Sequence, residues 1–139
     1  MIRPIVVDSS VVVKWFNQTN EKFLDQADKL LEDAQFGSIK LFAPELLRYE
    51  VGNALLYKKL SISQTNEVLA TLHQLPITFV AESETLAKQT YKIARSAEIT
   101  YYDASFVALA KQERATLITD NPKHQMKVKS AKVIALENY

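Results

Sequence analysis

The sequence predicts an α/β fold, a three-layer α/β/α sandwich around a central, mainly parallel sheet of about five strands. Short apolar runs alternate along the chain with longer stretches of helical periodicity, which is typical of parallel sheets with helical crossovers. No linker, repeat or low-complexity tract interrupts this alternation, and 139 residues is an ordinary length for one domain. We therefore expect a single domain over residues 1–139.

The expected strands are the short apolar runs. They lie near residues 3–7, 39–43, 77–80, 116–119 and 132–136. The first is followed directly by Asp8 and the fourth by Asp120, so each ends at a carboxylate. Pro76 separates the third strand from the helix before it.

The expected helices lie between these strands. They fall near residues 10–16, 20–36, 45–60, 63–73, 83–97 and 102–113. Asp8 or Ser9 is placed to cap the first helix. Pro44 precedes the helix at 45–60, and Glu45 occupies its first turn, where negative charge suits the helix dipole.

The later helices carry similar start signals. Ser63 precedes the helix at 63–73, and Ser83 precedes a helix in which Leu86 begins an apolar series at helical spacing. Thr100 is placed to cap the helix at 102–113. Together the helices supply the right-handed crossovers that a parallel sheet needs.

The composition excludes several classes of protein. The chain has no Cys, which rules out disulfides, thiolate metal sites and cysteine nucleophiles and fits a cytoplasmic location. With only two Gly, neither a P-loop nor a dinucleotide-binding fingerprint can be formed. No apolar run approaches the ~20 residues of a membrane helix, and the N-terminus lacks the layout of a signal peptide. A net charge of +1 means that any binding of nucleic acid needs a local patch.

Four acidic residues are placed where this fold brings side chains together. Asp8 and Asp120 follow strands, Glu50 interrupts the apolar face of a helix, and Asp103 opens another helix. In open α/β sheets the carboxyl ends of the strands and the starts of the following helices form the ligand crevice. Clustered carboxylates repel one another unless a hard cation neutralises them, and Mg²⁺ and Mn²⁺ prefer oxygen ligands. The pattern therefore predicts an acidic metal site, and such sites commonly hydrolyse phosphodiesters.

Each acidic residue also has a purely structural interpretation. Asp8 can cap a helix, and it can do so while binding a metal ion that Ser9 helps to orient. Asp103 sits at the third helical position after Thr100, as in a capping box. Glu50 is harder to explain structurally, because an unpaired charge beside an apolar face is expensive, although a solvated position at the edge of that face remains open. Asn53, one turn away, is placed to hydrogen-bond its carboxylate.

Four segments, taken together, resemble the PIN-domain family, and within it the VapC-type toxin ribonucleases. They are residues 5–10 (IVVDSS), 44–55 (PELLRYEVGNAL), 102–110 (YDASFVALA) and 117–120 (LITD). The segments occur in the family's order and span essentially the whole chain. The resemblance implies a PIN-like α/β/α domain.

The resemblance also implies a function. It implies that Asp8, Glu50, Asp103 and Asp120 are catalytic residues and metal ligands of an endoribonuclease that depends on Mg²⁺, with Mn²⁺ as a possible substitute. It further implies an RNA substrate and a small cognate antitoxin protein that covers the site. A homodimer is expected as well.

One position departs from the family's pattern. The last motif usually reads Leu-x-Thr-x-Asp, which would place the acidic residue at Asn121, two residues after Thr119. Either Asp120 takes over the role, or Asn121 binds the metal ion through its carbonyl oxygen and the site is weakened. We favour Asp120 slightly, with Thr119 as a supporting residue, although Asp120-Asn121-Pro122 also suits a turn.

The only local concentration of positive charge follows this motif. Lys123, Lys127 and Lys129 would hold RNA phosphates if they flank the acidic site, and a solvated surface segment is the alternative. The main rival to a ribonuclease is a non-catalytic PIN-like domain that binds RNA or acts as a scaffold, with a degenerate site marked by Asn121. A receiver-like phosphoacceptor domain is less favoured, because Asp8-Ser9-Ser10 lacks the acidic pair that it needs.

Overall fold

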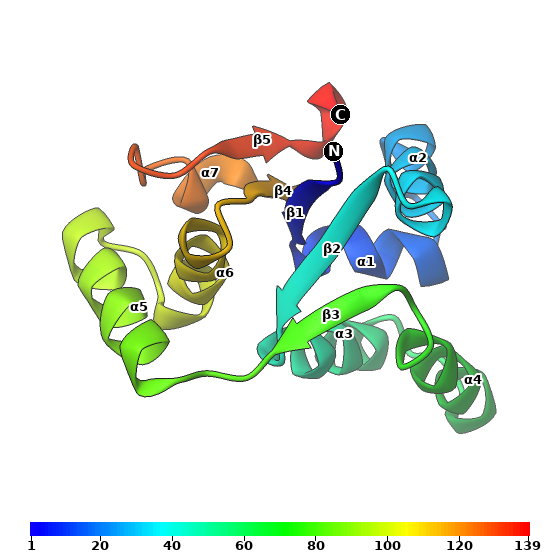
Figure 1. The fold of residues 1–139 in the computed structure, drawn as a ribbon. Coiled ribbons are helices and arrows are strands. Elements are labelled where there is room, and N and C mark those ends of the chain that lie inside the picture. Colours follow the sequence, from blue (N-terminus) through cyan, green and yellow to red (C-terminus); the bar gives the residue numbers. More distant parts are fainter.

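Five parallel strands form one central sheet in the computed structural model, which describes residues 1–139. The strands are β1 (Arg3–Val7), β2 (Ile39–Pro44), β3 (Ile77–Val80), β4 (Thr116–Thr119) and β5 (Val133–Ala135). Their order in the sheet is β3-β2-β1-β4-β5, and every neighbouring pair is parallel (Figure 1). The predicted parallel sheet is thus confirmed.

Two layers of helices cover the sheet. The helices are α1 (Ser9–Phe16), α2 (Leu24–Phe36), α3 (Leu46–Tyr57), α4 (Ile62–Leu72), α5 (Glu84–Ala97), α6 (Tyr101–Gln112) and α7 (Pro122–Gln125), followed at the end of the chain by a 3₁₀ turn at Leu136–Asn138. Helix α1 packs against α2 and α3, and α3 against α4, whereas α5 packs against α6 and α6 against α7 (Figure 1). The result is the expected α/β/α arrangement.

The strand order places a topological switch point between β1 and β4. The chain starts in the middle at β1, moves outward to β3, and then crosses back over the sheet to β4 on the other side of β1 (Figure 1). The segments that follow β1 and β4 therefore lead to opposite faces of the sheet. Ligands of open α/β sheets bind at such a switch point, so the fold directs attention to the residues that follow these two strands.

The core buries the two strands that lead to the site. Residues 5–7 of β1 and 117–119 of β4 are buried, and α6 contributes the buried run 106–110, which packs over the sheet. Burial on both faces is the reason why these strands appear in the sequence as continuous apolar runs. Because its backbone is fixed in this core, each strand delivers the residue that follows it to a defined position.

Two helix boundaries differ from the prediction by three residues or more, and α4 is capped by Ser61, which accepts from the Gln64 N–H at 3.1 Å, rather than by the expected Ser63. The helix expected from residue 20 begins at Leu24, because Asn20 and Phe23 adopt left-handed backbone angles and the Lys22 carbonyl accepts a hydrogen bond from a buried lysine. The helix expected to reach residue 60 ends at Tyr57, and Lys59 is left-handed. In addition, the residues after Asn121 form the short helix α7 rather than only a turn.

Candidate functional site

The candidate site lies at the switch point between β1 and β4. Asp8 follows β1 and Asp120 follows β4, as the strand ends predicted. Glu50 comes from the second turn of α3, and Asp103 from the first turn of α6. Four elements that are distant in sequence thus contribute the acidic residues predicted for the site.

Asp8 is buried and held by three donors. It caps α1: its Oδ2 accepts from the backbone N–H of Ser10 at 3.1 Å and from the Ser10 hydroxyl at 2.6 Å. Its Oδ1 accepts from Gln125 Nε2 at 3.3 Å. Burial nevertheless raises the pKa of Asp8 above its usual value, and the negative charge of Asp103 raises it further, against the lowering effect of these hydrogen bonds. The predicted capping role is confirmed, and no basic side chain forms an ion pair with Asp8.

Glu50 is partly buried and has no cationic partner. The hydroxyl of Ser9 donates to its Oε1 at 3.0 Å. Burial raises the pKa of Glu50 to about 7; the bond from Ser9 opposes this rise, and the charges of Asp8 and Asp103 add to it. Arg48, two residues earlier, places its guanidinium 3.7 Å from the centre of the Phe79 ring instead of pairing with Glu50.

Asp103 lies in the first turn of α6, near Asp8 and Glu50. Thr100 caps the helix by accepting from the Asp103 backbone N–H at 3.0 Å, as predicted. The Asp103 carboxylate itself has no hydrogen bond or ion pair, and its charge raises the pKa of both Asp8 and Glu50. Gln125 Nε2 also lies 3.4 Å from the Asp103 carbonyl, so α7 ties this helix start to Asp8.

The carboxylates of Asp8, Glu50 and Asp103 are the kind of ligand that a divalent cation prefers, but they do not surround a common point closely enough to form a preformed metal site. No group of three or more Asp, Glu, His or Cys side chains is close enough together to hold a metal ion as it stands. The three carboxylates do repel one another, and no positive side chain relieves that repulsion. Mg²⁺ keeps several of its waters and is often bound through only one or two carboxylates, so oxygen ligands in this loose arrangement fit the ion.

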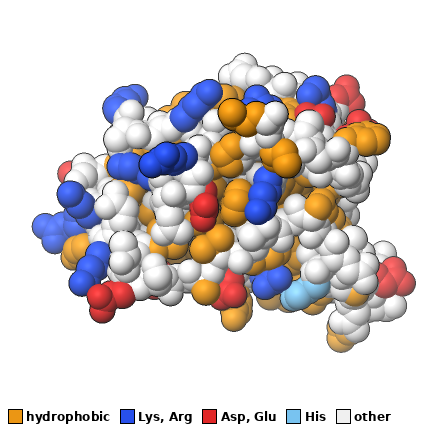
Figure 2. All heavy atoms as spheres, in the orientation of Figure 1, with side chains coloured by type: hydrophobic (Ala, Val, Ile, Leu, Met, Phe, Trp, Pro, Cys, Tyr) orange, Lys and Arg blue, Asp and Glu red, His pale blue; other side chains and the backbone are white.

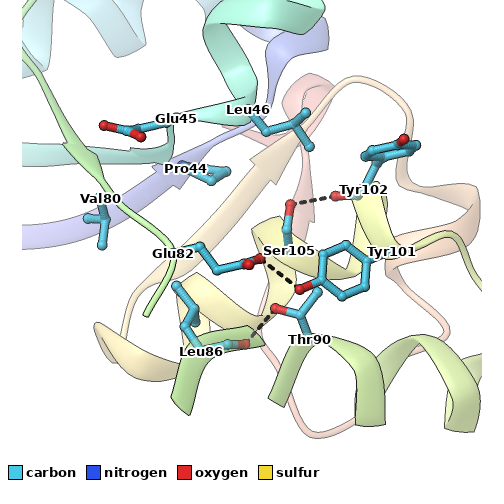
Figure 3. A pocket seen from close by; sticks show the side chains of 10 residues that line it. All are labelled: Pro44, Glu45, Leu46, Val80, Glu82, Leu86, Thr90, Tyr101, Tyr102 and Ser105. Carbon is cyan, nitrogen blue, oxygen red and sulfur yellow. Dashed lines mark hydrogen bonds between the residues drawn. The ribbon is translucent and has the colours of Figure 1, made fainter. Parts of the chain in front are cut away.

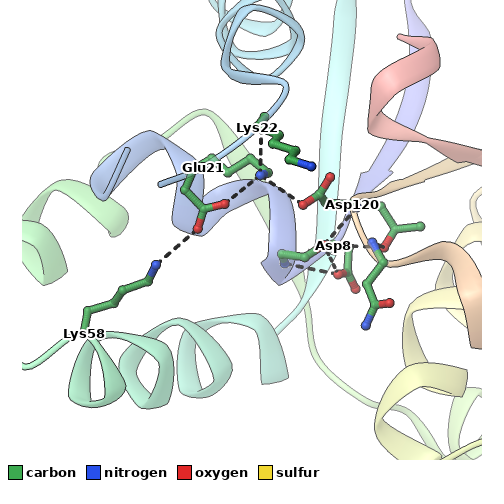
Figure 4. A network of polar contacts seen from close by, with 9 residues as sticks. Asp8, Glu21, Lys22, Lys58 and Asp120 are labelled. Atoms are coloured by element: carbon green, nitrogen blue, oxygen red, sulfur yellow. Dashed lines mark hydrogen bonds and ion pairs between the residues drawn. The ribbon is translucent and has the colours of Figure 1, made fainter. Parts of the chain in front are cut away.

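Asp120 is engaged differently from the other acidic residues. Its Oδ2 forms an ion pair with Lys14 Nζ at 3.0 Å (Figure 4). Lys14 also donates to Glu21 Oε2 and to the Lys22 carbonyl, both at 2.8 Å, and Glu21 Oε1 accepts from Lys58 at 3.2 Å. The carboxylate of Asp120 is therefore directed at a lysine.

The supporting residues only partly match the expectations. Ser9 orients Glu50 rather than Asp8, and no hydrogen bond joins the exposed Asn53 to Glu50. Thr119 is buried, and its hydroxyl accepts from the Asn121 N–H at 3.1 Å. The side chain of Asn121 makes no hydrogen bond.

Three residues that contact the acidic side chains were not predicted from the sequence: Ser10, Gln125 and Lys14. The Ser10 hydroxyl contacts Asp8 and also accepts from the Asp120 N–H at 3.0 Å, which links the ends of β1 and β4. Gln125 is buried, and its Oε1 has no hydrogen-bond partner. Lys14 is only 1% exposed. The repeated Ser after Asp8 was a usable signal for Ser10, but nothing in the sequence marks Gln125.

Two neighbouring hollows open on this side of the molecule, and one of them includes Glu50. One is lined by Ser9, Glu50, Asn53 and Tyr102, among others. The second, of about 190 Å³, is a more apolar pocket between the ends of β2 and β3, α5 and α6, in which the Tyr101 hydroxyl donates to Glu82 at 2.7 Å (Figure 3). Leu46 and Tyr102 line both hollows, so the two adjoin each other.

The basic residues after the last motif are exposed. Lys123 lies on α7, the same short helix whose Gln125 contacts Asp8, while Lys127 and Lys129 lie in the turn beyond it. None of the three forms an ion pair. On the face shown in Figure 2, Lys and Arg side chains are more frequent on the left-hand side of the view than on the right, with some acidic and apolar side chains among them.

Comparison with known families gives the family to which the chain belongs. The PIN domain family model matches residues 5–129, so the chain belongs to the PIN domain family. No curated protein matches the chain. None of its helices is long and apolar enough to cross a membrane.

Solved structures share the fold at low sequence identity. A protein from Pyrobaculum aerophilum is 23% identical, with a TM-score of 0.69 over 99% of this chain and 93% of its own. A toxin–antitoxin complex from Klebsiella pneumoniae includes a chain that is 19% identical, with a TM-score of 0.66 over 95% and 97%. VapC20 of Mycobacterium tuberculosis, a toxin that cleaves the sarcin–ricin loop, is 15% identical, with a TM-score of 0.61 over 81% and 86%.

Proposed function

We propose that this chain is a metal-dependent endoribonuclease and the toxin of a toxin–antitoxin pair. The observation that carries the proposal is the set of three carboxylates, Asp8, Glu50 and Asp103, at the switch point: no basic side chain pairs with them, and burial, with mutual repulsion added, raises the pKa of Asp8 and Glu50. Such an arrangement destabilises the free protein, and a bound cation removes the penalty. Membership of the PIN family and the toxin–antitoxin context of the structural relatives support the same conclusion.

Mg²⁺, or Mn²⁺ in its place, is the ion that these oxygen ligands suit. When bound, it would lower the pKa of a water molecule and offset charge on the phosphoryl group that is transferred. Asp8, Glu50 and Asp103 would hold it. Ser9 would orient Glu50, while Ser10 and Gln125 would keep Asp8 fixed.

The substrate in this proposal is RNA. Lys123 projects from the helix that contacts Asp8, so it is the basic residue best placed to hold a phosphate next to the site. Lys127 and Lys129 would contact further phosphates of the same RNA strand. Because phosphate contacts are largely electrostatic, binding through these lysines should weaken steeply as salt is raised.

A small antitoxin protein is the second proposed partner. Exposed apolar side chains gather on the outer surface of α3 and the start of α4, namely Tyr49, Leu56, Tyr57 and Ile62. Tyr49 and Tyr57 also line the hollow that contains Glu50. A partner that covers these side chains would also cover the site, and it would inhibit RNA cleavage by keeping RNA away from Glu50. Whether the chain also forms a homodimer is a separate prediction.

The decisive experiment is RNA cleavage by the purified chain. We expect cleavage of single-stranded RNA with Mg²⁺ or Mn²⁺ and none with EDTA. Asp103→Asn should abolish it, whereas Asp28→Asn, at an exposed position without contacts, should not. Unchanged cleavage by Asp103→Asn would contradict the proposal.

A non-catalytic RNA-binding or scaffold domain is the competing function, and the lack of a preformed metal cage favours it. In that case RNA would bind equally well in EDTA and in Mg²⁺, and no cleavage would accompany binding.

A further inference from the structure

Lys14 is the most unusual buried group in the molecule. It lies near the end of α1, is 1% exposed, and is among the largest fully buried side chains. Its ammonium has three N–H donors. The three oxygens around it are those of the Asp120 carboxylate at 3.0 Å, the Glu21 carboxylate at 2.8 Å and the Lys22 carbonyl at 2.8 Å. Every donor thus has a partner, and the ammonium has no capacity left for a ligand.

The ion pair fixes the role of Asp120. Removing its carboxylate from Lys14 would leave a buried ammonium partly unpaired, which is costly. Glu21 cannot take over alone, because it also accepts from Lys58. The four side chains form a chain of alternating charge, Asp120–Lys14–Glu21–Lys58, that joins the end of β4, the segment before α2 and the end of α3 (Figure 4).

We propose that Lys14 is the resident counter-ion of the fourth acidic position, so that Asp120 anchors the segment 17–23 while one divalent ion is held by Asp8, Glu50 and Asp103 without it. This inference rests on the proposed function, because it assigns the ligands of the proposed ion. It reverses our preference for Asp120 as a ligand. Lys14 and Asp120 are positioning residues in this account, not catalytic ones.

The backbone of Asp120 keeps a separate role. Its N–H donates to the Ser10 hydroxyl, which in turn donates to Asp8. A change of the Asp120 side chain leaves this link in place. Asp120→Asn therefore removes the charge that pairs with Lys14 and preserves the contacts that orient Asp8, which makes it a clean test.

The experiment is calorimetric titration with Mn²⁺ of the wild-type chain and three variants. Wild type should bind one ion. Asp103→Asn should weaken binding by about a hundredfold, because it removes a charged ligand. Asp120→Asn should change affinity by no more than about threefold, since it removes none. Glu21→Gln is the matched control: it removes the other anchor of Lys14, and both anchor variants should lower the midpoint of thermal unfolding by several degrees.

A measurement without substitution covers the case in which Asp120→Asn does not fold. In the wild-type chain labelled with ¹⁵N-lysine, the buried Lys14 ammonium should give a signal protected from exchange, and that signal should persist unchanged when Mg²⁺ is added. A shift or loss of the Lys14 signal would show that Asp120 leaves it for the ion and would overturn the inference.

The remaining outcomes separate the two proposals. Loss of Mn²⁺ affinity in Asp120→Asn comparable to that in Asp103→Asn, or a second ion in wild type that Asp120→Asn removes, would refute the role of Lys14 and leave the nuclease proposal intact. No binding of Mn²⁺ to wild type would refute both.

Discussion

Replacing Glu50 by Gln should stabilise the metal-free protein at high pH. The pKa of Glu50 rises from 4.5 to about 7 on folding, chiefly through burial. This rise corresponds to about 3 kcal/mol of destabilisation once the carboxylate is charged. Because Glu50 is only partly buried, solvent screening should leave about 1–2 kcal/mol of it. The Gln variant avoids this penalty and can still accept the hydrogen bond from Ser9.

The dependence on pH has a defined sign. A carboxyl group whose pKa is higher in the folded state binds its proton more tightly there, so the free energy of unfolding falls as pH rises from about 4.5 to about 7. Glu50→Gln should therefore exceed wild type by the full amount above pH 7, and the difference should vanish toward pH 4.5. Urea unfolding followed by circular dichroism in EDTA measures both limits. Glu67→Gln, at an exposed position on α4, should show no difference at either pH.

Mg²⁺ should reverse the order of stability at high pH. An ion that binds only the folded state raises the free energy of unfolding by an amount set by its concentration and affinity. Wild type should gain more than Glu50→Gln, because the variant has lost one charged oxygen ligand. If the variant were no more stable than wild type in EDTA at pH 8, Glu50 would not be the desolvated carboxylate described here. If wild type gained nothing from Mg²⁺, the cation site itself would be wrong.

Three further substitutions separate the roles of the surrounding residues. Asp8→Asn should abolish metal-dependent RNA cleavage and leave the melting temperature in EDTA unchanged or higher, since Asn caps helices as well as Asp does; a fall in that temperature would contradict this. Lys14→Met should lower the free energy of unfolding by about 3 kcal/mol, because it leaves the Asp120 carboxylate without a partner and Glu21 with Lys58 alone; a loss below about 1 kcal/mol in urea unfolding, the range of an exposed ion pair, would contradict this burial. Gln125→Leu should leave stability nearly unchanged, because it also removes the unpartnered Oε1; it should weaken Mn²⁺ binding by about tenfold in calorimetry, because it frees Asp8.

Much of the fold could be predicted because local patterns and tertiary environment agree. The strands that end at Asp8 and Asp120 are buried on both faces, so they appear in the sequence as uninterrupted apolar runs. The helix starts at Thr100 and Ser83 carry capping residues that form the expected bonds. Burial and capping are both local consequences of residue type, so the sequence predicts both.

The start of α2 was mispredicted because a tertiary contact overrides local propensity. Residues 20–23 carry no Pro or Gly and continue a helical pattern. The buried ammonium of Lys14 nevertheless needs oxygens, and it takes the Lys22 carbonyl and the Glu21 side chain. A carbonyl engaged in this way belongs to a loop wrapped around the ammonium. The sequence shows Lys14 only as one polar residue on a short helix, so it does not reveal this demand.

The positions of the acidic residues in the fold could be predicted from the sequence, but the ion pairs around them could not. Strand ends and helix spacing bring four carboxylates to one edge of the sheet, and Asp120 and Asp8 look equivalent at that level. In the folded chain they differ, since Lys14 neutralises Asp120 and no side chain neutralises Asp8. The fold thus places its one buried ammonium next to the carboxylate that lies outside the family's usual spacing. The other three acidic residues, Asp8, Glu50 and Asp103, have no basic side chain paired with them.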